Sequence, residues 1–386
     1  MQQHRRFLLP VTALTSVALL AACGGSPTST SGGDGGGGGA ETREDTDLAV
    51  AAKEVYDRFN GLTGQERTDE LVKCAEEEGQ LNVYTSNTDM EDLIDGFTDE
   101  YDIDVNNYRA QSETVLQRLI QEDEAGYYGA DIFETNALEL GVASAEGLLY
   151  PYQSELRDQV REEGRQNENW TATRFNVFVV GWNTDKVAPG EEPTSLEELA
   201  EPEWKGRVSM EVSDVDWFTA LHDYYVEEQG MSEEEFTDLM TRLAANSQIA
   251  KGHTTQGELL SAGQFDITVS SYSHTIDKAA NEDGAPVAWR PANGDPIQPL
   301  VVRPNGIGLV KTATNPCAAT LFVDYELTGG QDVFREAFRI GSIPVEGEDP
   351  LEGLETYPVP EDKLLEESDQ WNKAYEDVVR NGQSLE

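Results

Sequence analysis

The sequence predicts an α/β fold with two lobes, each built on a mostly parallel sheet flanked by helices. Strand-like apolar runs alternate with amphipathic helical patterns from about residue 68 to 145, which indicates a parallel sheet covered on both faces. A second unit of the same kind follows the apolar run 175–182. The globular part has roughly 310 to 340 residues, and single cores stop growing near 250 to 300 residues, so two lobes are expected.

The first unit opens with a helix from about Thr68, which Gly79 ends because glycine commonly follows a last helical turn. Strand and helix periodicities then alternate along the chain. The expected strands are 81–85, 103–108 and 130–133, and the expected helices carry Met90, Val115 and Leu138.

The second unit is predicted from strands 207–210 and 266–270 and from helices that begin near Val215, Ser232 and Tyr272. Two further strand-like runs lie within 299–310. Asn315-Pro316 then starts an apolar helix that ends at Gly329-Gly330, since proline is favoured at the first helical position. The acidic tail 346–386 indicates surface helices.

The first 22 residues have the form of a secretory signal, in which Arg5 and Arg6 precede an apolar run too short to span a bilayer. Cys23, directly after Leu-Ala-Ala, resembles the lipobox of bacterial lipoproteins, where this cysteine is acylated and becomes the mature N-terminus. The alternative is an ordinary signal cut nearby with a free thiol. The Gly/Ser-rich tract 24–39 is typical of a flexible tether. We therefore expect a lipid-anchored protein on the extracellular face of the cell membrane.

Composition limits the partners. A formal net charge of −47 would repel nucleic acid and anionic lipid headgroups, so no nucleic acid is expected and the membrane is expected only through the anchor. The acids are spread along the whole chain, which favours an acidic surface over a cation-binding site.

Cys74 and Cys317 remain as a pair if Cys23 carries lipid. In an oxidising compartment a bond between them is allowed, and closing so long a loop is worth roughly 4 to 5 kcal/mol in the loop-entropy model. The alternative is two buried free thiols that pack as small apolar side chains. These residues alone leave both alternatives open.

Seven short phrases carry a family resemblance over roughly residues 68–345. They are Leu81-Asn82-Val83-Tyr84-Thr85-Ser86, Ala130-Asp131-Ile132-Phe133, Gly147-Leu148-Leu149, Trp182-Asn183-Thr184, Glu203-Trp204-Lys205-Gly206-Arg207, Gly284-Ala285-Pro286-Val287, and Asn315-Pro316-Cys317-Ala318-Ala319 with Gly330-Gln331. In order and spacing they resemble the extracellular solute-binding proteins of ABC importers, within the subgroup that includes bacterial ferric-iron-binding proteins.

The resemblance implies a type II periplasmic-binding-protein fold, in which crossover hinge strands join two lobes that close on a ligand. The implied parts are a signal peptide at 1–22, a tether and acidic lead-in at 23–67, lobe 1 at 68–181 plus 300–345, lobe 2 at 182–299, and C-terminal surface helices at 346–386. Cys74 and Cys317 would then both lie on helices of lobe 1, so the resemblance favours the disulfide.

Topology places the ligand site beyond the carboxyl ends of the strands, against helix N-termini whose free N–H groups attract acceptors. Each polar residue there could merely cap its helix, but their convergence favours a site. Trp217, at a helix start, is either a cleft aromatic or a packing residue, and Gln256 is expected in a loop that offers one polar contact. The candidate ligand-binding residues are Ser86, Asn87, Thr88, Ser112, Asn136, Trp217, Gln256 and Tyr272.

Ferric-binding members of the family typically use a histidine, a glutamate and two adjacent tyrosines as hard ligands. By position these fall on Thr88, Asn136 and Tyr272-Ser273, so one of the four ligand types is retained. Tyr272 is the best metal candidate, with Glu134 and His274 as weaker neighbours. Bound ferric iron therefore stays open beside a small anionic solute, and no other cofactor is expected.

We expect a monomeric, non-enzymatic receptor that captures a small molecule or ion between two lobes and delivers it to the permease of an ABC importer. The sequence has no Gly-x-Ser-x-Gly and no His-Glu-x-x-His motif. Chance pairs among 74 acidic residues leave an extracellular enzyme open. A sensory lipoprotein on the same fold is the third reading.

Overall fold

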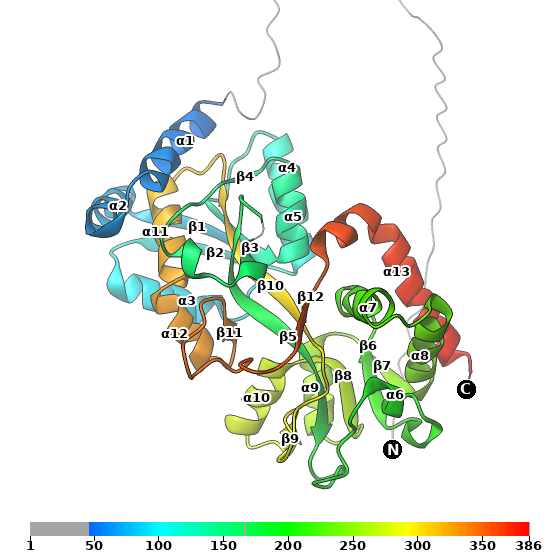
Figure 1. The fold of residues 1–386 in the computed structure, drawn as a ribbon. Helices are drawn as coiled ribbons and strands as arrows, with labels where there is room; N and C mark the ends of the chain where they lie inside the picture. Colours follow the sequence, from blue (N-terminus) through cyan, green and yellow to red (C-terminus); the bar gives the residue numbers. More distant parts are fainter. Residues whose placement is uncertain (1–45, 166, 386) are drawn as a thin grey trace, which may run out of the picture. The chain divides into compact units, whose positions relative to one another are not determined.

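One continuous sheet passes through both lobes, with two long antiparallel strands at its centre (Figure 1). The computed structural model describes residues 46–165 and 167–385 of the 386-residue chain. The strand order along the sheet is β2-β1-β3-β10-β5-β8-β6-β7. The signal peptide, Cys23 and most of the tether lie outside the described residues and stay predictions.

In the first lobe, the strand β1 (Gln80–Thr85) runs parallel to both of its neighbours, β2 (Asp104–Arg109) and β3 (Ile132–Asn136). Their carboxyl ends therefore lie at one edge of the sheet, as the alternation of strand and helix predicts. The surrounding helices are α2 (Gly64–Glu78), α3 (Met90–Glu100), α4 (Ser112–Glu124), α5 (Ala137–Ala145), α11 (Pro316–Glu326) and α12 (Gly329–Glu336).

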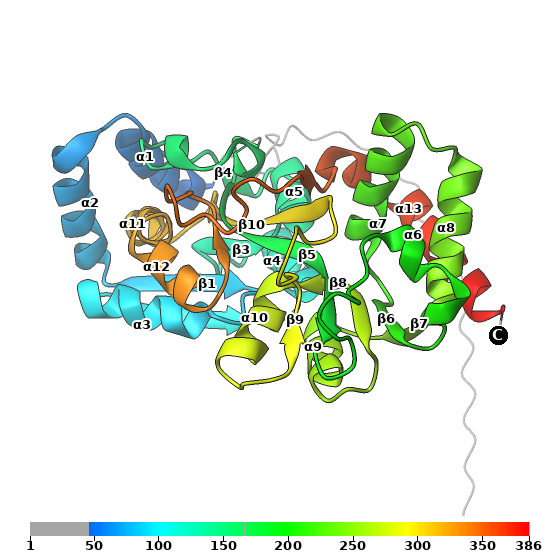
Figure 2. The same cartoon turned by 60° about the horizontal axis from the view of Figure 1, so that its bottom comes forward.

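In the second lobe, β6 (Val208–Glu211) runs parallel to β7 (Ser247–Ala250) and to β8 (Ile267–Tyr272). The helices α9 and α10 lie together beside β8 and the short strand β9 (Val287–Ala288), as Figure 2 shows. The helices of this lobe are α6 (Leu196–Leu199), α7 (Val215–His222), α8 (Glu233–Asn246), α9 (His253–Ser261) and α10 (Ser273–Asn281), and a π-helix, Asp223–Glu228, continues α7.

The strands β5 (Thr171–Asn183) and β10 (Leu300–Val310) cross between the lobes and pair with each other. β10 also pairs with β3 in the first lobe, and β5 with β8 in the second. All 13 residues of β5 are buried, which explains the unbroken apolar run of its second half. The expectation of two strand runs within 299–310 is wrong, because β10 is one strand that absorbs Pro304 and shifts register at Asn305/Gly306.

Buried side chains form two hydrophobic clusters. The first contains Phe97, Phe133 and Phe322, and it extends through the crossing strands to Ile276 on α10. The second lies mainly in the second lobe and contains Phe218 of α7 among its aromatic residues. The two-lobed α/β fold class is thus confirmed, and the residue boundaries of the lobes stay predictions.

The two ends of the described chain are more tightly packed than expected. The helix α1 (Asp47–Asn60) buries Ala52, Tyr56 and Phe59 in the first cluster, so this part of the lead-in is not a tether. The long helix α13 (Glu361–Gln383) buries Trp371 and Tyr375 in the second cluster, and it packs against α7, α8 and α5. The remaining short strands are β4 (Leu149–Tyr150), β11 (Ile340–Gly341) and β12 (Thr356–Pro358).

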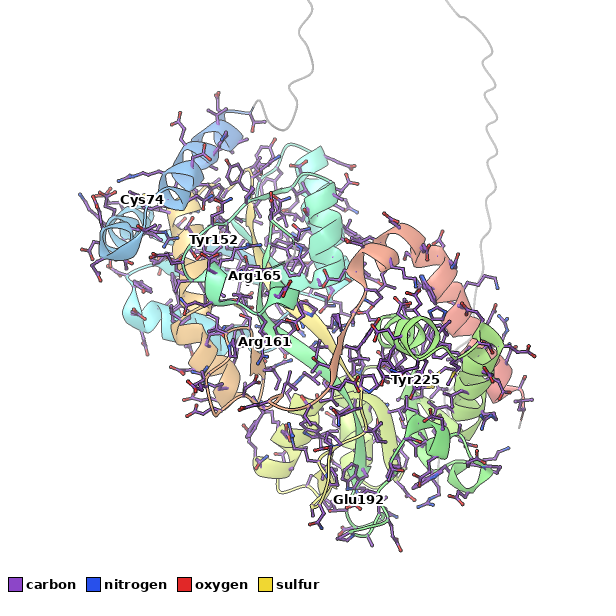
Figure 3. All side chains as sticks on the ribbon, in the orientation of Figure 1. Cys74, Tyr152, Arg161, Arg165, Glu192 and Tyr225 are labelled. Atoms are coloured by element: carbon purple, nitrogen blue, oxygen red, sulfur yellow. A yellow bond between two sulfur atoms is a disulfide. The ribbon has the colours of Figure 1, made fainter. Side chains whose placement is uncertain are left out.

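A disulfide joins Cys74 on α2, labelled in Figure 3, to Cys317 at the start of α11, with 5.7 Å between the two Cα atoms. The same two helices are tied by a buried ion pair of Arg67 with Asp324. In the part of the chain that the structure describes, no helix is long and apolar enough to cross a membrane.

Candidate functional site

Polar segments at the carboxyl ends of the parallel strands line two cavities whose walls come from both lobes. The larger, of about 670 Å³, lies between Thr88, Asp89 and Arg339 of the first lobe and the helices α9 and α10; we call it the α10 cavity. The smaller, of about 390 Å³, lies between α4 and α5 of the first lobe and the start of α7, with α13 at its side; we call it the α7 cavity.

Tyr272, at the end of β8, connects the two cavities. Its phenol oxygen accepts a hydrogen bond of 2.6 Å from Nη2 of Arg303, which lines the α7 cavity. Its ring stacks on His274, which lines the α10 cavity, at 5.4 Å between ring centroids, and lies 3.8 Å from the ring of His253. Burial raises the pKa of Tyr272, and the positive charge of Arg303 lowers it by less. The net pKa is raised, so the phenol stays protonated at neutral pH.

Arg303 projects from the crossing strand β10 and is held by two elements of the second lobe, β8 and α7. Its Nη1 donates to Oδ2 of Asp216, in the first turn of α7, at 2.9 Å. Burial disfavours the guanidinium charge, but the electrostatic attraction of Tyr272 and Asp216 outweighs burial and raises the pKa of Arg303. The side chain therefore stays charged and fixed beside the α7 cavity.

Arg339, which follows α12, organises the first-lobe wall of the α10 cavity. Its Nε donates to Asp89 at 2.7 Å and its Nη2 to Thr88 at 3.0 Å, while its Nη1 reaches Asn176 of β5 at 3.2 Å. His274 faces it, with 3.5 Å between Nη1 and Nδ1. Burial, together with the charge of Arg339, holds the pKa of His274 well below its usual range, so this imidazole is neutral.

Glu134 does not reach the cleft. It is fully buried on β3, where it pairs with Arg174 of β5 and accepts hydrogen bonds from Thr85 and Asn87. The expectation that Glu134 is a nearby metal ligand is therefore wrong. Asn87 is equally a support: it is 3% exposed, and its side chain also accepts from the backbone N–H of Asp89.

The other first-lobe candidates lie near strand ends. Ser86 shares a hydrogen bond of 2.9 Å with Thr135. Asn136 precedes α5, lines the α7 cavity and donates to Ser112 Oγ, at the start of α4, at 2.9 Å. Thr88 is exposed and lines the α10 cavity. The structure therefore places Thr88 and Asn136 at different ends of the cleft.

Two candidates face away from both cavities. Trp217 is 4% exposed and belongs to the second hydrophobic cluster, so of its two expected roles it has the one of a packing residue. Gln256 is fully buried on α9, not in a loop, and its Nε2 donates to the Ser209 hydroxyl at 3.3 Å and to the Val269 carbonyl at 3.1 Å. Each side chain lies on the inner face of its helix, so neither lines one of the two cavities.

The positions of the ferric ligand set do not form a preformed iron site. Thr88, Asn136 and Ser273 are neutral, and the phenol of Tyr272 is protonated and already bonded to Arg303. Elsewhere in the described chain, the groups of three or more His, Cys, Asp and Glu whose ligand atoms lie within 4.8 Å of one another are Cys74/Glu78/Cys317 and His222/Asp223/Glu227. The first contains the disulfide, and the ammonium group of Lys363 binds Asp223 and Glu227 in the second.

The candidate ligand-binding residues named from the sequence leave out five residues that shape the cleft: Arg303, Arg339, His253, Asp214 and Asp216. An arginine inside the apolar segment Leu300–Val310 was a usable signal, since a charged residue in a buried strand needs a partner. Nothing in the local pattern marked Arg339, because its partners Thr88 and Asp89 lie some 250 residues away.

The sequence is similar to those of known bacterial proteins. Residues 131–327 match the family described as bacterial extracellular solute-binding protein. The chain is 31% identical over 277 residues to Iron uptake protein A1 of Synechocystis, an alignment that covers 68% of this chain and 75% of that protein. It is 30% identical over 177 residues to the Fe(3+)-binding periplasmic protein of Serratia marcescens, covering 45% and 50% of the two chains.

Solved structures share the fold. Iron-bound HitA from Pseudomonas aeruginosa superposes with a TM-score of 0.64 at 20% identity, over 78% of this chain and 99% of that one. Apo FutA2 from Synechocystis gives a TM-score of 0.60 at 23% identity, over 78% and 98%. Two lobes, crossing strands and the matched sequence together place this chain in the family of bacterial extracellular solute-binding proteins.

Proposed function

We propose that this protein captures a positively charged solute in the cleft between its lobes and delivers it to the permease of an ABC importer. The main support for this proposal is the negative charge of the cleft. Four carboxylates and two basic side chains line the α10 cavity, and four carboxylates and one arginine line the α7 cavity. Such an excess of one sign between low-dielectric walls attracts the opposite charge.

Some of the acidic residues in the cleft differ from the many acidic residues on the surface because they are buried. Asp214 is 5% exposed, and the Asp216 side chain is 17% exposed. Acidic residues that only make a surface soluble lie exposed to water. The sequence favoured an acidic surface over a cation site because it could not distinguish buried acids from exposed ones. The charge of the cleft also disfavours the small anionic solute that the sequence left open.

Ferric iron is one cation to test, because the names of two similar proteins refer to iron. This chain would hold it differently from the family's ligand set, of which it retains only Tyr272. Carboxylate oxygens are hard ligands, and Oδ2 of Asp214 lies in the α7 cavity without a hydrogen-bond partner. The proposal requires no catalytic turnover, since capture needs only contacts that form when both lobes meet the cargo.

The test uses protein purified without metal, titrated calorimetrically and followed by thermal unfolding. The probes are ferric ion supplied as its nitrilotriacetate complex, the diamine putrescine, and citrate and phosphate, with nitrilotriacetate alone as control. A bound cation at 100 times its dissociation constant should add about 2.7 kcal/mol of stability. Stabilisation by citrate or phosphate, with neither cation bound, would contradict a receptor for cations.

The anchor and the monomeric state are parts of the same proposal. Cys23 lies at the end of the signal-like segment, and one or more lipid chains there would keep the receptor beside its permease. We expect Cys23→Ala to release the protein into the medium of expressing cells, and sedimentation of the purified protein to give the mass of one chain. Retention of the variant on the cells would contradict the anchor.

A further inference from the structure

The α7 cavity contains buried carboxylate oxygens that lack a partner among the described residues. Asp214 is 5% exposed and lines the cavity; its Oδ1 lies 3.0 Å from Nε2 of His253, whereas its Oδ2 has no hydrogen-bond partner. Oε2 of Glu139, on another wall of the same cavity, is also buried without a partner. Buried carboxylate oxygens are costly unless a donor satisfies them, so these two oxygens are available to accept hydrogen bonds from a ligand.

The start of α7 is not free to bind an anion. A helix N-terminus attracts negative charge, and here the protein supplies that charge itself: Asp214 occupies the N-cap position and Asp216 the first turn. An external anion would also face Glu139 and Glu113 across the cavity. The electrostatics of the cavity therefore select a cation.

A single metal ion fits this cavity poorly. The carboxylates of the α7 cavity do not form one of the groups of three or more ligand atoms within 4.8 Å that occur in the described part of the chain. Arg303, fixed by Asp216 and Tyr272, places a guanidinium among them. A compact ion of high charge would need several of these oxygens at one point and would meet that guanidinium.

The walls between the carboxylates are aliphatic. Asp214 and Glu139 belong to different lobes, and branched apolar side chains separate the acids around the cavity. These side chains are Leu116, Leu138, Val142, Val215 and Leu364. A volume of about 390 Å³ falls in the range of sites that enclose small organic molecules.

We propose that the α7 cavity binds an organic cation that carries ammonium groups on a short alkyl chain, with the ammonium groups against Asp214 and Glu139 and the chain against the aliphatic wall. This inference rests on the proposed function, of which it names the class of cargo. Each ammonium group donates up to three hydrogen bonds, which matches the unpartnered carboxylate oxygens. Methylene groups recover the apolar contact that a hydrated metal ion cannot make.

Binding should release protons near pH 7. Burial, together with the charge of Asp216, raises the pKa of Glu139 to about 7, so part of this carboxyl is protonated in the free protein. An ammonium group beside it favours the ionised form. Calorimetry in two buffers of different ionisation enthalpy measures this release directly.

The experiment titrates the full-length, detergent-solubilised protein with putrescine, and separately with magnesium ion and with ferric nitrilotriacetate. We compare the wild type with Asp214→Asn and Glu139→Gln, and use Glu76→Gln as a matched control because Glu76 is exposed on α2 and lines neither cavity. Either α7-cavity variant should weaken putrescine binding at least tenfold, and the control should stay within twofold. Thermal unfolding of each free variant verifies that it folds.

The outcomes separate the inference from the proposed function. Ferric binding without putrescine binding overturns the inference and leaves a cation receptor standing. Equal weakening by Glu76→Gln, or magnesium binding that depends on Asp214 while putrescine fails to bind, also overturns it. Binding of citrate or phosphate alone removes the proposed function and the inference together.

Discussion

Arg303 donates a 2.6 Å hydrogen bond to the phenol oxygen of Tyr272, and this contact joins the crossing strand β10 to the carboxyl end of β8. The same guanidinium binds Asp216 on α7. One buried cation thus fixes the orientation of the Tyr272 ring and of Asp216, which lines the α7 cavity. Any change in lobe closure that moves α7 relative to β8 must rearrange this triad.

Tyr272→Phe should weaken putrescine binding about tenfold. The substitution removes the acceptor for Arg303 Nη2, and the released guanidinium then competes with the ammonium groups for the carboxylates of the α7 cavity. Isothermal titration calorimetry measures the loss. Tyr127→Phe is the matched control, because Tyr127 is 60% exposed and lines neither the α10 cavity nor the α7 cavity. Unchanged affinity in Tyr272→Phe would show that Arg303 is held by Asp216 alone.

Asn87→Ala should cost about 1 to 3 kcal/mol of unfolding free energy, whereas Thr88→Ala should change it by less than about 0.5 kcal/mol. Asn87 donates to the fully buried Glu134 and accepts from the Asp89 backbone, so its loss leaves buried groups unsatisfied. Thr88 is exposed and accepts one hydrogen bond from Arg339. Urea unfolding of the two variants compares them directly. Equal losses would mean that Asn87 does not support Glu134.

The regular elements could be predicted from the sequence because their signals are local. Gly79 adopts the left-handed conformation (φ 66°) that ends α2, and Ser232 with Glu235 forms a capping box at the start of α8. Strand 81–85 was placed within one residue of its observed start. The crossing strand β10 was divided in two because Pro304 is uncommon in a central strand.

The cleft was harder to predict because its chemistry depends on contacts between distant segments. Asp214 directly precedes α7 in the sequence, but only the fold shows that it is buried with one oxygen unpartnered. Glu134 lies two residues from Asn136, yet Arg174 of β5 holds it inside the sheet. Trp217 was left between two roles, and its burial in the second hydrophobic cluster favours the core.

Removal of the disulfide should lower the unfolding free energy by up to about 5 kcal/mol. The bond closes a separation of 243 residues, and in the loop-entropy model a long closed loop restricts the unfolded chain most. Urea unfolding of Cys74→Ser/Cys317→Ser, beside the wild type with and without reductant, tests this. The reduced wild type should match the double variant. A wild-type midpoint that reductant leaves unchanged would contradict a formed bond.

Glu361→Gln should make the protein less sensitive to alkaline pH. Burial, together with the charges of Asp362 and Asp216, raises the pKa of Glu361 to about 8 in the folded state. Because the folded state then binds a proton more tightly than the unfolded state, stability is fully present below about pH 4.5 and is lost as the pH rises through 8.

Glutamine resembles the protonated acid, so the variant should gain stability relative to the wild type between pH 5 and pH 9. A shift of about 3.5 pKa units sets a ceiling of about 5 kcal/mol, and we expect about 2 kcal/mol because part of the carboxyl group reaches solvent. Urea unfolding at both pH values measures the difference. Glu366→Gln, at an exposed position of the same helix, is the control and should follow the wild type. If both variants show the same pH dependence, Glu361 is not the group that titrates.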